Sequence, residues 1–184
     1  MRIIAGMAKK RLLKVPSGWT GRPTADRVKE SLFSILGGFV PECRFLDLFA
    51  GTGNVGIEAL SRGAGMAVFV EKDRRAASAI RHNLSITGFE RNSRLIVRDV
   101  FGALAELEGY GEAFDVVFLD PPYGAGLETP VMESVLAKKL LSPGGVMIAE
   151  SSKRDQLPSV IMESSLYRRE RYGDTIISFY KIML

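Results

Sequence analysis

The sequence closes an apolar run on four residues that are unusual at the end of a strand: Asp120, Pro121, Pro122 and Tyr123. Successive prolines remove backbone donors and stiffen the chain, so they fix the direction in which the backbone leaves the strand. A carboxylate and a carbonyl held there can accept the two hydrogens of an amine conjugated to an aromatic ring, whose nitrogen is otherwise a poor nucleophile. The tyrosine offers a flat face for an unstacked base. This pattern predicts a site for the exocyclic amine of a nucleobase, where catalysis consists mainly of positioning.

A glycine-rich loop earlier in the chain could hold a cofactor beside that site. Its glycines follow the spacing Gly51-x-Gly53-x-x-Gly56 between a predicted strand and a predicted helix. Glycines at these positions let the backbone turn sharply and approach a ligand closely. The loop alone fits NAD, FAD or S-adenosylmethionine, and it is also compatible with a plain strand-to-helix turn.

Carboxylates at the ends of predicted strands favour S-adenosylmethionine. Asp47 would repel a pyrophosphate but could accept a hydrogen bond from the ammonium group of a methionine moiety, and this cofactor carries no phosphate for the helix N-terminus. Glu71 can accept both hydroxyls of an adenosine ribose, a device that NAD enzymes share. Asp99 is placed to hold the adenine amino group or, alternatively, to cap the helix that follows.

A parallel sheet would bring these residues together. Apolar runs predict strands at 44–50, 66–71, 93–99, 114–120 and 144–151. Helical patterns follow at 54–62, 74–88, 101–107 and within 131–140, after a first helix at 25–36 that Thr24 could cap. Apolar strands that alternate with helices indicate a parallel α/β sheet covered on both faces, whose carboxyl edge binds ligands. Two final strands around Gly173-Asp174 predict an antiparallel hairpin.

Composition narrows the class of protein. The chain has 184 residues, enough for one domain with a core, and no apolar segment approaches the length of about 20 residues that spans a bilayer. Its start does not have the pattern of a signal peptide, so we expect a cytoplasmic protein. A single cysteine, Cys43, excludes an internal disulfide. The single histidine, His82, leaves little room for a histidine-based metal site, and we expect no metal.

The N-terminal residues are basic although the net charge of the chain is only +4. Between Met1 and Thr24 there is no acidic residue, and the basic residues are Arg2, Lys9, Lys10, Arg11, Lys14 and Arg22. This excess suits a polyanionic partner, although a solvated surface strand would carry the same charges. We expect a small basic hairpin or arm at 1–23 and one larger domain at 24–184.

Five segments together resemble the RsmD family, class I S-adenosylmethionine-dependent methyltransferases that act on guanine N2 in bacterial small-subunit (16S) ribosomal RNA. The segments are "RIIAGMAKKRLLKVP", "RPTADRVKESLFSIL", "LDLFAGTGNVGIEALSRGA", "FVEKD" and "FDVVFLDPPY". The resemblance implies a Rossmann-like domain with a seven-stranded, mostly parallel sheet that ends in an antiparallel hairpin. It also implies S-adenosylmethionine as cofactor, and small-subunit ribosomal RNA or a 30S assembly particle as partner.

The resemblance assigns roles to individual residues. The amine-binding and base-stacking group comprises Asp120, Pro121, Pro122 and Tyr123. The methionine part of the cofactor would contact Asp47, Gly51 and Gly53, while Glu71 would bind the ribose and Asp99 the adenine. Thr52 is a further candidate for cofactor binding. Arg22 and Thr24 resemble the part that closes over the cofactor. The RNA backbone would be held by Arg2, Lys9, Lys10, Arg11 and Lys14 while an unpaired guanine is presented to the site.

The sequence departs from the family pattern at a few positions and leaves other functions open. Thr52 and Asn54 replace the more frequent Ser and Ala, and Ser34 replaces Asn. One alternative is an adenine-N6 methyltransferase acting on DNA or RNA, which can share the Asp-Pro-Pro-Tyr sequence. Another is a non-catalytic cofactor-binding factor in ribosome assembly. The glycine loop alone would also fit a nicotinamide-dependent dehydrogenase, for which no acid–base group is evident.

Overall fold

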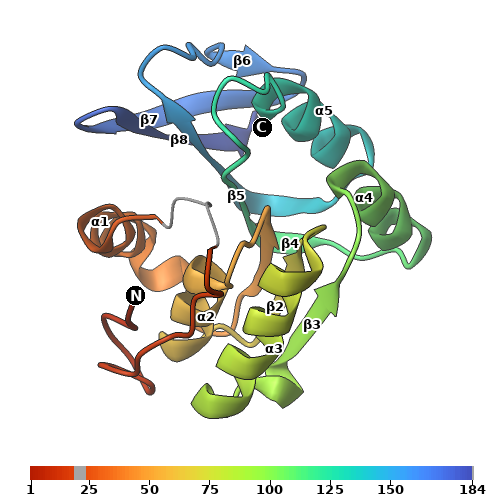
Figure 1. The fold of residues 1–184 in the computed structure, drawn as a ribbon. Helices are drawn as coiled ribbons and strands as arrows, with labels where there is room; N and C mark the ends of the chain where they lie inside the picture. Colours follow the sequence, from red (N-terminus) through yellow and green to blue (C-terminus); the bar gives the residue numbers. More distant parts are fainter. Residues whose placement is uncertain (19–23, 184) are drawn as a thin grey trace.

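An eight-stranded sheet runs through the centre of the computed structural model, which describes residues 1–18 and 24–183 (Figure 1). The strand order is β3-β2-β1-β4-β5-β8-β7-β6. The strands are β1 (Arg44–Leu48), β2 (Met66–Val70), β3 (Ser93–Ile96), β4 (Phe114–Leu119), β5 (Leu141–Ser152), β6 (Val160–Ile161), β7 (Ser164–Tyr172) and β8 (Thr175–Ile182). The helices are α1 (Asp26–Leu36), α2 (Asn54–Ser61), α3 (Arg74–Thr87), α4 (Val100–Gly109) and α5 (Glu128–Ala137).

The sheet is parallel from β3 to β5 and antiparallel beyond it. β8 pairs with β5 and then with β7, which it meets in a hairpin at Gly173-Asp174. The prediction of a mostly parallel α/β sheet that ends in a C-terminal antiparallel hairpin is therefore confirmed. The described sheet has one strand more than the seven expected, namely the two-residue β6 at its edge.

Both faces of the sheet are buried, as the apolar strands predicted. In β1, Phe45 faces a core shared with α1, α2 and α3, whereas Leu46 faces a core shared with α4 and α5. Both side chains are fully buried. Figure 1 shows these two groups of helices on opposite sides of the sheet. This arrangement explains why the central strands carry almost no polar residues.

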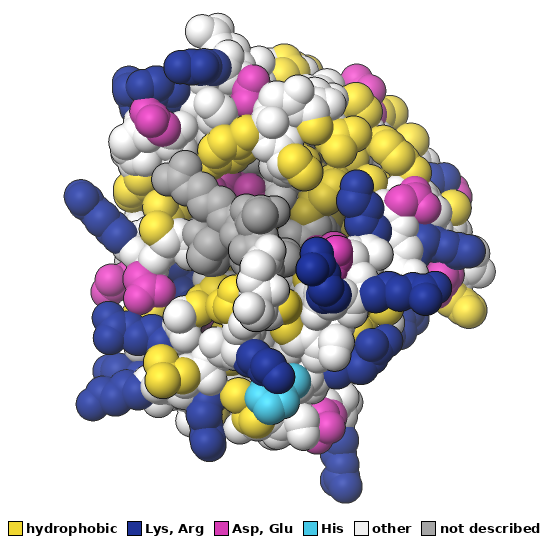
Figure 2. All heavy atoms as spheres, in the orientation of Figure 1, with side chains coloured by type: hydrophobic (Ala, Val, Ile, Leu, Met, Phe, Trp, Pro, Cys, Tyr) yellow, Lys and Arg dark blue, Asp and Glu magenta, His cyan; other side chains and the backbone are white. Residues whose placement is uncertain are grey.

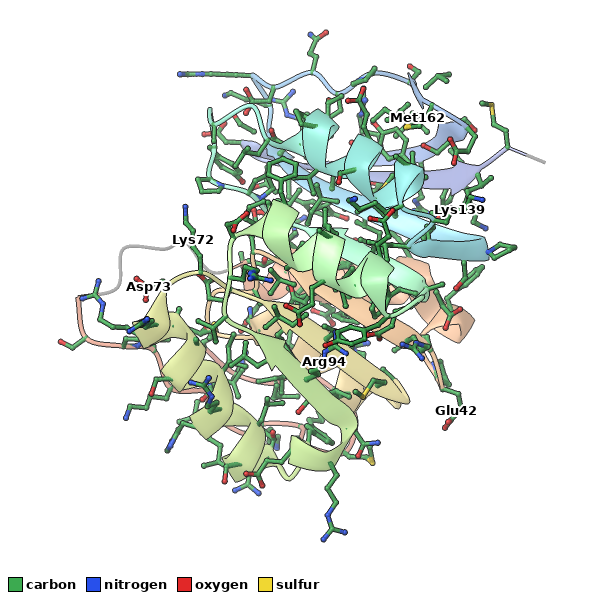
Figure 3. All side chains as sticks on the ribbon, turned by 90° about the vertical axis from the view of Figure 1, so that its right-hand side faces the viewer. Glu42, Lys72, Asp73, Arg94, Lys139 and Met162 are labelled. Atoms are coloured by element: carbon green, nitrogen blue, oxygen red, sulfur yellow. The ribbon has the colours of Figure 1, made fainter. Side chains whose placement is uncertain are left out.

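The register of the strands brings the ends of β1, β2, β4 and β5 to one edge. Leu119, the last residue of β4, pairs with Leu48 of β1 on one side and with Ala149 of β5 on the other. Figure 3 shows Lys72 and Asp73, which follow β2, at this edge, and Glu42 at the opposite edge. The prediction that the fourth strand lies beside the first is confirmed.

The first residues form a hairpin that packs against the main domain. Arg2 and Leu12 form an antiparallel bridge, and the Ile3 amide donates to the Arg11 carbonyl at 3.0 Å. The side chains of Ile3 and Leu13 are buried in the core that contains α1, α2 and α3. The described part of the arm therefore shares a hydrophobic core with the sheet.

Some predicted boundaries were wrong. Thr24 does not cap α1, because Ala25 is the N-cap residue and the Thr24 hydroxyl instead donates to Glu150 at 3.2 Å. The helix predicted within 131–140 is α5, which begins earlier, at Glu128. Pro130 lies in its first turn, where a proline is tolerated. β3 ends at Ile96, well before Asp99.

Candidate active site

A cleft of about 510 Å³ lies at the carboxyl edge of the parallel strands. Its lining includes most of the residues predicted for cofactor and amine binding: Thr24, Asp47, Gly51, Thr52, Glu71, Asp120, Pro121, Pro122 and Tyr123. Gly53 and Asp99 are not part of this lining, and Arg22 lies outside the described residues. The cleft therefore brings the glycine loop and the Asp-Pro-Pro-Tyr turn to one site.

The glycine loop has the geometry that its sequence predicts. Gly53 has a φ of 81° and is the N-cap residue of α2, so the loop turns directly into the helix. A side chain at Gly56 would collide with the Phe69 ring, so only glycine lets α2 pack this closely on β2. The Gly51 amide donates to the Glu71 carboxylate at 2.8 Å, which ties the loop to the end of β2.

Asp47 holds the same loop from the floor of the cleft. Its side chain is buried and accepts a hydrogen bond from the Gly56 amide at 2.8 Å. Burial raises the pKa of Asp47 to about 7, and the Glu71 carboxylate adds to this increase while the bond from Gly56 opposes it. A cationic ligand group in the cleft would stabilise the ionised form of Asp47.

We expect Asp47→Asn to change the pH dependence of stability. The folded-state pKa of Asp47, about 7, lies above the unfolded value of 3.8. The contribution of this carboxyl group to stability is therefore fully present at pH values below the unfolded pKa. That contribution is lost as the pH rises through the folded pKa. The free energy of unfolding of the wild type should fall, relative to the variant, by on the order of a few kcal/mol between about pH 4 and pH 8. Urea denaturation across this range measures the difference, and parallel pH curves would contradict it.

Glu71 combines a structural role with the capacity to bind a ligand. One carboxylate oxygen accepts from the Gly51 amide and the other from the Asp73 amide, each at 2.8 Å. Partial burial raises the pKa of Glu71, an effect opposed by these two hydrogen bonds. The Lys72 amide adds a third, weaker contribution. A carboxylate can accept about four hydrogen bonds, so the group retains capacity for a ribose hydroxyl.

Asp99 caps α4, as the alternative interpretation predicted. Its carboxylate accepts a hydrogen bond from the Gly102 amide at 3.0 Å. Its neighbours Arg98 and Val100 line the cleft. A contact between Asp99 and an adenine remains a prediction.

The Asp-Pro-Pro-Tyr turn leaves β4 between the ends of β1 and β5. Pro121 is buried, whereas the Tyr123 side chain remains 38% exposed at the cleft. The Tyr123 hydroxyl donates to Glu150 at 3.2 Å and lies 3.1 Å from the Thr175 hydroxyl. Burial raises the pKa of Tyr123 to about 12, and the Glu150 and Asp120 carboxylates add to the increase. The ring is therefore anchored at its hydroxyl end beside two carboxylates.

Glu150 is a cleft residue that the sequence did not reveal. It is 5% exposed, and its carboxylate accepts hydrogen bonds from the hydroxyls of Thr24 and Tyr123. A sequence signal was present, because Glu150 is an acidic residue at the end of the otherwise apolar run that starts at Val146. Its relation to Asp120 depends on the register between β4 and β5, which the sequence alone does not define.

A buried polar network beneath the loop was also missed. The Lys29 ammonium is fully buried and donates to the Arg2 carbonyl at 2.8 Å and to Asn54 at 2.6 Å. It also forms an ion pair with Glu58, which in turn accepts from the backbone amides of Ile4 and Ala5. Burial lowers the pKa of Lys29, and Glu58 opposes this shift. The network joins the arm, α1 and the start of α2.

The basic side chains of the arm are exposed. Arg2 forms an ion pair with Asp26, whereas Lys9, Lys10, Arg11 and Lys14 belong to the exposed surface. Figure 2 shows Lys and Arg side chains projecting from the lower part of the molecule, where Figure 1 places the arm and α3.

Within residues 1–18 and 24–183, no helix is long and apolar enough to cross a membrane. The same ranges contain no cluster of ligating side chains suited to a metal ion.

Comparison with known proteins finds relatives that match nearly the whole chain. The family model described as conserved hypothetical protein 95 matches residues 1–181. The ribosomal RNA small subunit methyltransferase D of Escherichia coli (strain K12) is 34% identical over 181 residues, covering 98% of this chain and 89% of that protein. The Bacillus subtilis protein YlbH is 35% identical over 181 residues, covering 98% of both chains.

A solved structure supports the same relationship. The structure of yhhF from Escherichia coli superimposes with a TM-score of 0.88 at 34% sequence identity, covering 99% of this chain and 97% of that chain. The chain therefore belongs to the conserved hypothetical protein 95 family, together with the ribosomal RNA small subunit methyltransferase D proteins, which confirms its resemblance to the RsmD family.

Proposed function

We propose that the protein transfers a methyl group from S-adenosylmethionine to the exocyclic N2 of a guanine in small-subunit (16S) ribosomal RNA. The observation that carries this proposal is that Asp120 and Pro121 line the same cleft as Gly51 and Glu71. The turn that would bind the amine and the loop that would bind the cofactor therefore line one cavity. The names of the relatives supply the ribosomal RNA, and the RsmD resemblance supplies guanine.

The cleft residues fit S-adenosylmethionine. Glu71 would accept the ribose hydroxyls, and Asp47, buried with a raised pKa, would gain a cationic partner in the ammonium group. Apolar side chains of Phe49, Val70 and Val100 also line the cleft and suit a purine ring. When bound, the cofactor supplies a methyl group on a sulfonium, which is already a good leaving group.

The Asp-Pro-Pro-Tyr turn would prepare the amine. Asp120 and the Pro121 carbonyl accept one amine hydrogen each, which favours a tetrahedral nitrogen whose lone pair is turned toward the methyl donor. After the nitrogen–carbon bond forms, the nitrogen must lose a proton, and the Asp120 carboxylate is a nearby acceptor. Tyr123 would support the plane of the base, at about 1–3 kcal/mol for a stacked base.

The arm would hold the RNA backbone. We expect the double variant Lys9→Ala/Arg11→Ala to weaken RNA binding, because each phosphate that the protein no longer neutralises reduces the slope of log K against log salt by about 0.7–0.9. Both side chains are exposed, so the fold should be unaffected. Binding titrations at several salt concentrations measure the slope. The matched control Arg91→Ala/Lys138→Ala removes equal charge elsewhere and should keep the wild-type slope; identical slopes in both variants would contradict the role of the arm.

Labelled methyl transfer tests the whole proposal. The purified protein is incubated with methyl-labelled S-adenosylmethionine and with free 16S RNA, 30S assembly intermediates or mature 30S subunits, and the product nucleosides are analysed. We expect N2-methylguanosine in at least one of these substrates. N6-methyladenosine would favour an adenine methyltransferase. Cofactor binding without transfer to any substrate would favour an assembly factor.

A further inference from the structure

Glu150 occupies a position on β5 equivalent to that of Asp120 after β4. Leu119 pairs with Ala149, so Asp120 and Glu150 are the next residues along two neighbouring parallel strands. Asp47 pairs with Phe118, two residues before Asp120. Because side chains alternate along a strand, residues paired or two apart share a face of the sheet. All three carboxylates line the cleft.

The surroundings of Glu150 leave it able to accept a hydrogen bond from a ligand. Its two oxygens accept from the hydroxyls of Thr24 and Tyr123, each at 3.2 Å, which is long for a hydrogen bond between a hydroxyl and a carboxylate. A carboxylate has about four acceptor positions. The Tyr123 hydroxyl also has the Thr175 hydroxyl within reach at 3.1 Å, so it can keep a partner if a ligand binds Glu150.

The nucleobases differ in what lies beside their exocyclic amine. In guanine the ring nitrogen N1, next to the N2 amine on the Watson–Crick edge, carries a hydrogen and is a donor. In adenine and cytosine the ring nitrogen next to the amine on that edge is an acceptor. A carboxylate beside the amine site would therefore accept a hydrogen bond from guanine but would face a lone pair on the other two bases.

We propose that Glu150 determines base specificity by accepting the N1–H of the target guanine while Asp120 and the Pro121 carbonyl hold its N2 amine. This inference rests on the proposed guanine-N2 methyl transfer and deepens it. Sites built to bind an N–H reject an analogue that lacks it far more strongly than apolar sites reject a missing methylene, because the buried acceptor is left without its partner. Glu150 is such a buried acceptor.

The test compares two RNAs that differ at the methylated position. Once the methylated guanine is mapped, the RNA is prepared with guanine or with 2-aminopurine there, in the form that supports methyl transfer. 2-Aminopurine keeps the N2 amine but has no hydrogen on N1 and no oxygen on C6, so the change in the ratio caused by Glu150→Gln is the measurement that isolates N1. We expect kcat/KM of the wild type to be about 100-fold or more lower for 2-aminopurine. In Glu150→Gln the amide can donate to the unprotonated N1, so this ratio should shrink by about tenfold or more.

The control variant separates base recognition from support of the tyrosine. Tyr123→Phe removes the hydroxyl that contacts Glu150 but keeps the ring, so rates can fall while the guanine to 2-aminopurine ratio stays at the wild-type value. If Glu150→Gln slows both substrates equally, Glu150 acts only by positioning Tyr123 and the inference is overturned.

Two further outcomes are decisive. If the wild type methylates both RNAs equally well, the inference is overturned without any variant. If the wild type forms no N2-methylguanosine, it is the proposed function that fails.

Discussion

Asp120→Asn is expected to lower the rate constant for methyl transfer by about 10²–10³-fold, comparable to the loss of one preorganised polar group in other active sites. Asparagine keeps the shape of the side chain but removes the negative charge and places an amide NH₂ where the substrate amine must donate. Cofactor affinity should stay within about threefold, because Asp47 and Glu71, the carboxylates that we propose bind the cofactor, are unchanged. Single-turnover methyl transfer and cofactor titration measure the two effects separately.

Asp115→Asn is the matched control, because Asp115 lies near the start of β4, at the end of the strand opposite to the one that Asp120 follows. Its carboxylate accepts from the Arg44 amide at 2.8 Å, which an asparagine oxygen can also do. This variant should transfer methyl groups at close to the wild-type rate. If Asp120→Asn keeps more than about a tenth of the wild-type rate, Asp120 is not the principal amine acceptor.

The second large effect is on stability. Lys29→Met should lower the free energy of unfolding by about 3–5 kcal/mol, the usual loss when one partner of a buried ion pair is removed. The substitution leaves the Asn54 oxygen and the Arg2 carbonyl without their ammonium donor. Urea denaturation monitored by circular dichroism measures the loss.

Lys138→Met provides the comparison for a surface ion pair. Lys138 contacts Glu108 at 2.6 Å, but both side chains are partly exposed to solvent. We expect a loss of less than about 1 kcal/mol. Equal losses in the two variants would show that the buried network contributes no more than a surface pair does.

The local patterns of the sequence predicted the framework and the positions around the cleft. The glycine loop, the strand ends and the Asp-Pro-Pro-Tyr turn are short segments whose geometry depends on the residues within them. The RsmD resemblance, which was drawn from these segments and from two N-terminal ones, is confirmed by the family match. Long-range relationships were less accessible. Thr24 has the residue type of a helix cap, but its hydroxyl contacts Glu150, which is 126 residues away in the sequence.

Buried polar residues were the other failure. Lys29 lies on a helix whose other buried residues are apolar, and nothing in the local pattern distinguishes it from an exposed lysine. Its partners come from the arm and from α2, so its burial depends on tertiary packing. Glu150 was missed because a strand end can be solvated or buried, and only the neighbouring strands decide which.

The position of β8 determines when, during synthesis of the chain, the cleft can be completed. β8 is the last strand made, yet it lies between β5 and β7 within the sheet. Asp47, the glycine loop and Glu71 are all translated in the first half of the chain, whereas Thr175, which contacts the Tyr123 hydroxyl, belongs to β8. The residues that we propose bind the cofactor are therefore synthesised early, whereas the contact between Tyr123 and Thr175 forms only when the C-terminal strand joins the sheet. Premature termination before β8 would remove Thr175, the hydroxyl partner of Tyr123, and would leave β5 without its antiparallel neighbour.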